Sequence, residues 1–222
     1  MATSSLINTV VIIIVIISLP AVAWFFKFRK TMIKKQVNIL RYLENEYMPK
    51  DQTYWYLGYL VGFRGKYRIN RGKLENVYVL YTMPPYHVFF YLPIIWLFKK
   101  KERLEIIHQL KENNPLRGEA HMANMKIRSI KLSMNADLRD FSKYKTTTIN
   151  MKGVEYKVYY TGGNALDIAT NLFNTLISKV NVFRVSVDAS RNSILVSFEP
   201  KTLEDIGFVI DALRRITRSW TE

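Results

Sequence analysis

The chain has 222 residues, and its 33 Lys and Arg outnumber its 18 Asp and Glu, which gives a formal charge of +15. Hydrophobic residues make up 49% of it, enough for a folded core and too many for a disordered basic tail. The absence of cysteine excludes disulfide scaffolds, Cys-ligated zinc or Fe–S sites and thiol catalysts. Three histidines, His87, His108 and His121, leave little for a metal or acid–base site. The composition favours a basic protein that binds an anionic partner over an enzyme.

Residues 6–26 form an apolar stretch without a formal charge. As a helix these 21 residues reach ~32 Å, which matches the hydrocarbon core of a bilayer. A cleaved signal peptide is the alternative, but residues 1–5 hold no Lys or Arg. We therefore expect residues 1–26 to be a short tail and a transmembrane helix in contact with the lipid bilayer, with Trp24 at the membrane surface.

The residues that follow this stretch are strongly basic, whereas those before it are not. The basic residues of this flank, expected at the membrane surface, are Lys27, Arg29, Lys30, Lys34 and Lys35. By the positive-inside rule the N-terminus lies outside and the remainder of the chain is cytoplasmic. The sequence thus predicts a single-pass protein of the cell membrane, or of the ER membrane in a eukaryote.

A second apolar stretch, residues 86–98, has two interpretations. Its 13 residues reach only ~20 Å as a helix, which is too short to span a bilayer. The first interpretation is therefore a buried strand or core segment. The alternative is an interfacial or re-entrant membrane element, which its aromatic residues favour. In that case Trp96 and the run Lys99, Lys100 and Lys101 lie at the membrane surface, where lysines attract anionic headgroups.

The part after the membrane helix divides into three predicted regions. Residues 27–49 show helical spacing and predict a basic juxtamembrane helix. Residues 50–135 predict a basic, β-rich region next to the membrane. Within it we expect a strand pair or one bent strand over 53–69, a strand over 74–83, a helix over 100–113 and a strand over 125–134.

Residues 136–222 predict a ββαββα unit. Two hairpins, 146–161 and 182–199, are separated by a helix that begins after Gly162-Gly163-Asn164 and ends near residue 180. Thr202 and Asp205 resemble a capping box before a last helix that ends near Ser219. The predicted fold class is α+β, in which one N-terminal transmembrane helix precedes a cytosolic domain with helices packed on an antiparallel sheet.

The basic excess is concentrated near the membrane. Residues 27–131 hold 21 Lys and Arg against 8 Asp and Glu, whereas residues 132–222 hold 12 against 10. The densest group outside the juxtamembrane run is Arg64, Lys66, Arg68, Arg71 and Lys73. On a strand the first three share one face, so the group is either a solvated basic face or a ribbon that binds the phosphates of RNA or lipid.

No motif for catalysis is present. The sequence contains no GxxxxGK[ST], HExxH, CxxC or GxSxG pattern, so we expect no catalytic residues, no metal ligands and no cofactor. The Gly162-Gly163-Asn164 turn precedes a helix and is able to bind an anion, but such a glycine pair more often only forms the turn.

The order of these features resembles the calumin-like family, the ribosome-binding subunit of the PAT intramembrane chaperone complex. The shared features are the single span, the basic juxtamembrane helix, the Trp- and Gly-containing region from Trp55 to Gly65, the phrase FKKKERLEIIHQL over 98–110 and the segment 126–134. The resemblance covers residues 6–135. The acidic luminal segment and the C-terminal coiled coil of that family are absent from this sequence, so calcium binding is not implied.

The resemblance implies a non-enzymatic, membrane-anchored adaptor that assists membrane-protein insertion or folding next to the ribosome and the Sec translocon. The implied partners are ribosomal RNA, translocon subunits and a small membrane protein beside the transmembrane helix. The alternative is a structural subunit of a cell-envelope assembly, such as a pilus, secretion or DNA-uptake machine, with a cytosolic protein-docking domain. An enzyme acting on lipids or nucleotides is the least favoured hypothesis, because no catalytic group of residues is found.

Overall fold

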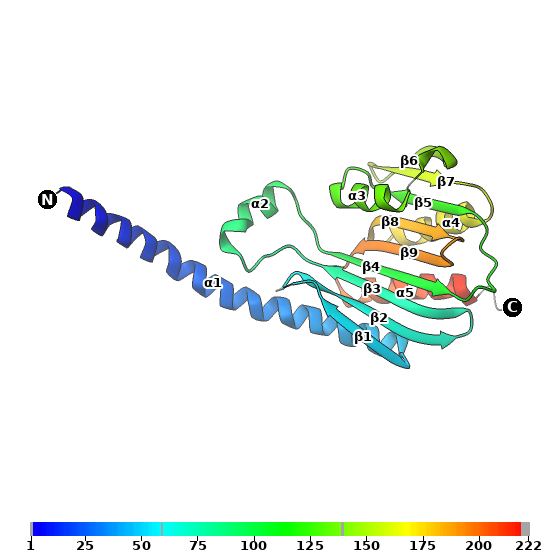
Figure 1. Ribbon diagram of the computed structural model, residues 1–222, viewed down its shortest axis with the longest axis horizontal. Coiled ribbons are helices and arrows are strands. Elements are labelled where there is room, and N and C mark those ends of the chain that lie inside the picture. The colour runs from blue at the N-terminus through cyan, green and yellow to red at the C-terminus, as the bar shows by residue number, and fades with distance from the viewer. Residues whose placement is uncertain (1, 59, 139, 219–222) are drawn as a thin grey trace.

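A computed structural model describes residues 2–58, 60–138 and 140–218. A long N-terminal helix, α1 (Ala2–Tyr47), projects from a domain built on one nine-stranded antiparallel sheet (Figure 1). The predicted α+β class is confirmed. Met1 and Ser219, the expected ends of the tail and of the last helix, lie outside the described residues.

The sheet joins strands from all parts of the chain after α1. Its order is β1-β2-β3-β4-β9-β8-β5-β7-β6, so β4 pairs with β9 and β5 lies between β8 and β7. The strands are β1 (Asp51–Tyr56), β2 (Gly62–Arg71), β3 (Leu74–Thr82), β4 (Arg103–Leu110), β5 (Glu119–Ala123), β6 (Lys145–Met151), β7 (Val154–Tyr160), β8 (Asn181–Asp188) and β9 (Ser193–Glu199).

The helices after α1 are short. They are α2 (Leu92–Leu97), α3 (Arg128–Asp137), α4 (Ala165–Ile177) and α5 (Leu203–Arg218), with 3₁₀ turns η1 (Phe89–Tyr91) and η2 (Phe141–Lys143). The buried faces of α1, α4 and α5 join one face of the sheet in the main hydrophobic core. On the opposite face, which we call the free face, α3 covers only part of the surface and forms a small second core.

Most predicted elements are confirmed. The strand pair and strand expected within 53–83 are β1, β2 and β3, and the hairpins expected after residue 146 are β6–β7 and β8–β9. The helix expected to end near residue 180 is α4. The capping box is also confirmed, because Asp205 N–H donates to Thr202 Oγ1 at 3.2 Å and Thr202 N–H donates to Asp205 Oδ2 at 3.1 Å.

Two expected elements are wrong. The helix expected over 100–113 is strand β4, because the buried positions 104, 106, 108 and 110 alternate. The strand expected over 125–134 is mostly helix α3. Its buried side chains Ile130 and Met134, and Leu138 directly after its end, recur every four residues. In both segments a few apolar residues fit either period, and packing against the sheet decided between them.

The predicted juxtamembrane helix is confirmed as the second half of α1, but its buried face differs from the expected one. The side chains that enter the core are Met32, Ile39, Leu43 and Tyr47, whereas Ile33 is 41% exposed. Tyr47 Oη forms a hydrogen bond of 2.8 Å with His108 Nε2 on β4. Arg214 Nη1 of α5 donates to Glu46 Oε2 at 2.9 Å. The second half of α1 is therefore an integral part of the domain.

His108 makes this junction sensitive to pH. Complete burial, together with the nearby Arg214, lowers the pKa of its imidazole from 6.5 to about 3. The folded protein therefore keeps His108 neutral at a pH where the unfolded chain protonates it. Because the unfolded state binds more protons between these two values, this residue lowers stability as the pH falls below 6.5.

We predict that replacing His108 by Gln, which does not titrate, flattens the pH dependence of stability. In the wild type this one residue removes about 1.4 kcal/mol per pH unit below pH 6. Urea unfolding of the full chain in detergent micelles between pH 7 and pH 4.5 measures the slope. Equal slopes for His108→Gln and wild type would show that folding does not lower the pKa of His108.

Candidate phosphate-binding face and membrane interface

Helix α1 is long and apolar enough to cross a membrane. Its most apolar 18-residue window has a mean hydropathy of 2.7, and none of that window is buried in the protein. The exposed side chains before Phe26 are almost all aliphatic. Among the described residues, α1 is the one helix that meets these criteria.

The second apolar stretch packs beside this helix. Trp24 Nε1–H donates a hydrogen bond of 2.8 Å to the Tyr86 carbonyl, and its ring lies edge-on to Phe89 with centroids 5.9 Å apart. Phe25 meets His87 in the same way, at 5.8 Å. These contacts fold residues 86–98 back along α1, as the loop that carries α2 shows in Figure 1.

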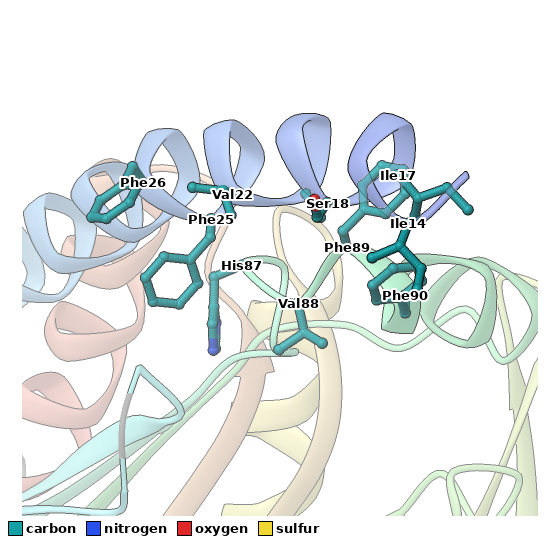
Figure 2. Close-up of a pocket in the computed structure, with 11 residues that line it drawn as sticks. Ile14, Ile17, Ser18, Val22, Phe25, Phe26, His87, Val88, Phe89 and Phe90 are labelled. Carbon is teal, nitrogen blue, oxygen red and sulfur yellow. The ribbon is translucent and has the colours of Figure 1, made fainter. Parts of the chain in front are cut away.

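An apolar groove of about 630 Å³ lies between the two segments (Figure 2). One wall consists of α1 residues from Ile14 to Phe26, and the other of residues 87–90. Ile14 lies twelve residues before Phe26, or ~18 Å along the helix axis. Residues 87–90 therefore lie level with the segment of α1 that we expect inside the bilayer.

The buried-strand interpretation of residues 86–98 is wrong. The segment contains η1 and α2, and only a few of its side chains, among them Leu92 and Ile95, are buried. Four large apolar side chains are more than 60% exposed, namely Phe90, Trp96, Leu97 and Phe98. The exposed lysines Lys99, Lys100 and Lys101 follow at once, and Lys101 Nζ lies 2.7 Å from Glu199 Oε2. This arrangement matches a membrane-surface element.

The basic residues after the span are spread around α1. Lys27, Lys30 and Lys34 are exposed, and Arg29 is partly buried. Lys35 instead contacts the domain, with its Nζ 2.6 Å from Glu102 Oε2. Lys35 thus helps to join α1 to the start of β4, a role that the sequence did not indicate.

The structure brings together three of the five predicted phosphate-binding residues. Arg64, Lys66 and Arg68 project from β2 on the free face, while Phe63 and Tyr67 between them enter the core. Within the described part of the chain, none of the three forms an ion pair. The register places Asp51 of β1 opposite Arg68, but no ion pair joins them. Three neighbouring cations that form no ion pair are a suitable arrangement for a row of phosphates.

The other two predicted residues lie at the far end of the same hairpin. Arg71 is exposed at the β2–β3 turn, and Lys73 Nζ donates to the Asn113 carbonyl at 2.7 Å. Lys73 is therefore partly engaged in holding the turn. The basic group is one row of three with an extension at the turn, rather than five equivalent sites.

Sequence reasoning missed two aromatic residues beside this row. Strand pairing places Trp55 of β1 opposite Arg64 and Tyr78 of β3 opposite Lys66, all on the free face. Lys66 Nζ lies 5.7 Å from the centre of the Tyr78 ring, within cation–π range. Only the register of the sheet reveals these neighbours, because no spacing along the chain encodes it.

Beyond Tyr78 the free face sinks into a polar groove of about 280 Å³. The groove crosses β4, β9, β8 and β5, and its base includes Arg184, which is 2% exposed. Arg184 Nε donates to Ser186 Oγ at 2.7 Å, and its Nη1 donates to Ser133 Oγ of α3 at 2.9 Å. Arg184 thus fastens α3 to the sheet, and sequence reasoning gave it no role.

Groups of three or more His, Asp or Glu side chains able to hold a metal ion are not found among the described residues. His121 lies in the polar groove, where its Nε2 is 3.9 Å from Glu119 Oε2 and its ring meets Tyr144.

No family model matches the chain, and no curated protein is significantly similar to it.

The chain has no cysteine, so single-cysteine variants can be spin-labelled without a background. We predict that a label at Phe98→Cys, in the full chain reconstituted in liposomes, is accessible to membrane-dissolved oxygen and shielded from a water-soluble nickel relaxant. A label at Ser190→Cys, an exposed turn position in the sheet domain, is the control and should show the opposite preference. Nickel accessibility at position 98 as high as at position 190 would contradict a membrane-surface role for residues 86–98.

Proposed function

We propose that this protein is a non-enzymatic, membrane-anchored adaptor whose basic sheet face binds RNA phosphates beside the ribosome and the Sec translocon. Helix α1 supplies the anchor, with the N-terminus outside and the sheet domain in the cytoplasm. The resemblance to the calumin-like family supports the ribosome and translocon as partners. The exposed aliphatic surface of α1 leaves room for a small membrane protein beside it.

The observation that carries this proposal is the height above the membrane of the far end of the basic row, at Arg68. Tyr47 lies 21 residues after Phe26, so it is ~32 Å farther along the α1 axis. Its ring stacks against Tyr67, with centroids 6.1 Å apart, and Tyr67 is the neighbour of Arg68 on β2. With α1 along the membrane normal, Arg68 therefore lies roughly four Debye lengths from the membrane boundary at physiological ionic strength.

At this height the anionic headgroups of the anchoring bilayer exert little attraction on Arg68 or Arg71. Arg64 and Arg68 are nevertheless exposed, and none of the three cations of the row forms an ion pair among the described residues. A polyanion that extends into the cytoplasm can reach these cations at this distance from the membrane and supply the negative charge that they lack. Ribosomal RNA is such a polyanion. Of the two phosphate sources, RNA or lipid, the geometry therefore favours RNA.

The alternative, a subunit of a cell-envelope assembly, is supported by a different feature. Strand β6 ends the sheet and pairs only with β7, and its residues 145–148 are all exposed. Such an edge can accept a strand from another protein. A docking protein of this kind would use β6 and would not need the basic row.

We predict that the triple variant Arg64→Glu, Lys66→Glu, Arg68→Glu loses ribosome binding. The full chain in neutral-lipid nanodiscs should co-sediment with ribosomes, and the variant should retain less than a tenth of that binding, since three attractive phosphate contacts become repulsive. Wild-type binding should also weaken steeply between 50 and 200 mM salt.

The matched control is the triple variant Lys179→Glu, Lys201→Glu, Arg215→Glu, which changes the charge equally at exposed positions outside β2. It should bind ribosomes nearly as well as the wild type. If both triple variants lost ribosome binding equally, the loss would be explained by net charge alone and not by the position of the β2 residues. If the β2 triple variant bound ribosomes as well as the wild type does, the proposal would be contradicted.

A further inference from the structure

We propose that Trp55 and Tyr78 stack the bases of unpaired RNA while Arg64, Lys66 and Arg68 hold its phosphates. This inference rests on the proposed RNA binding and specifies the ligand as single-stranded. It adds two residues to the site and makes the free face at β1–β3 a nucleotide-binding platform.

The strand register places the aromatic and basic side chains in adjoining rows. Trp55 is opposite Arg64, and Lys66 is opposite Tyr78. Directly opposed side chains on one face of a sheet are about 5 Å apart, and successive side chains along a strand on that face are ~6.8 Å apart. The two aromatic rings therefore flank the basic row on its two sides.

The exposed position of Trp55 is not explained by packing or hydrogen bonding within the described residues. It is 51% exposed on β1, the edge strand of the sheet, and no hydrogen bond or ring contact holds it among the described residues. Large aromatic residues on an exposed edge promote unwanted association and are normally avoided there. An exposed indole beside cations that form no ion pair is instead typical of surfaces that stack nucleobases.

Tyr78 joins the platform to the rest of the free face. Its ring lies under Lys66 Nζ on one side and lines the polar groove on the other. The same groove contains amide and hydroxyl groups, including those of Gln109 and Ser186, which can hydrogen-bond the edge of a base. A base stacked on Tyr78 would thus have polar partners within the same depression.

The platform selects unpaired RNA because stacking on a side chain needs a free base face. In an A-form duplex each base already stacks on its neighbours, and only phosphates and 2′-hydroxyls remain for recognition. A duplex would therefore contact the basic row and leave Trp55 and Tyr78 unused. Single strands, loops and bulges can use both sets of residues.

The test uses the full chain in phosphatidylcholine nanodiscs and a fluorescein-labelled 12-nucleotide oligouridine, with a 12-base-pair RNA duplex as comparison. Fluorescence anisotropy should show that Trp55→Leu and Tyr78→Leu each weaken single-strand binding about 10-fold, within the range for loss of one stacked base. Both variants should bind the duplex as the wild type does. Circular dichroism and urea unfolding check that the variants are folded.

Tyr56→Leu is the matched control, because Tyr56 is 75% exposed on the same edge strand but its side chain alternates to the other face. It should not change single-strand affinity. Single-strand binding that is lost in the Arg64, Lys66, Arg68 charge reversal but unchanged in Trp55→Leu and Tyr78→Leu would overturn stacking and leave phosphate binding intact.

If the wild-type protein bound neither the oligouridine nor the RNA duplex, this inference and the proposed function would both be overturned. The same holds if phosphatidylserine vesicles bind the protein and Trp55→Leu weakens only that binding. These outcomes separate a failure of base stacking from a failure of RNA binding, and they identify lipid as the source of phosphate if RNA is not.

Discussion

The geometry of this protein depends on α1 being one uninterrupted helix that serves two environments. Its first half exposes aliphatic side chains, and its second half buries Met32, Ile39, Leu43 and Tyr47 in the main core. The Tyr47–His108 hydrogen bond and the Arg214–Glu46 ion pair fix the end of the helix to β4 and α5. Because the domain cannot lose this half of α1 without losing part of its core, the position of the sheet relative to the first half is set by the fold.

That constraint fixes where the free face lies relative to the first half of α1. Residues 86–98 return along the first half of α1 and hold a second apolar element beside it, through Trp24 and Phe25. The strands of the sheet run away from this region, so the basic row on β2 extends from its base toward the far turn (Figure 1). Helix α1 and residues 86–98 thus lie side by side at one end of the sheet, an arrangement that is compatible with the proposed adaptor function.

Elements could be predicted from the sequence where the hydrophobic pattern fits only a helix or only a strand, or where a local motif marks the element. The apolar stretch 6–26, the hairpins after residue 146 and the Thr202–Asp205 capping box are all determined locally, and all were predicted. The segments at 103–110 and 128–137 were misassigned because their apolar residues fit both periods. Strand β5 was missed because it is short and contains two alanines. The neighbours Trp55 and Tyr78 of the basic row come from strand pairing, which is a property of the whole sheet and leaves no local pattern.

The most direct test of the account is to find what touches the free face in the membrane of a living cell. A photo-crosslinking amino acid placed at position 78 in the full chain reports the molecule that lies against β3. The account predicts adducts that are sensitive to ribonuclease and contain ribosomal RNA sequence. Adducts with lipid or with protein alone, unchanged by ribonuclease, would contradict it.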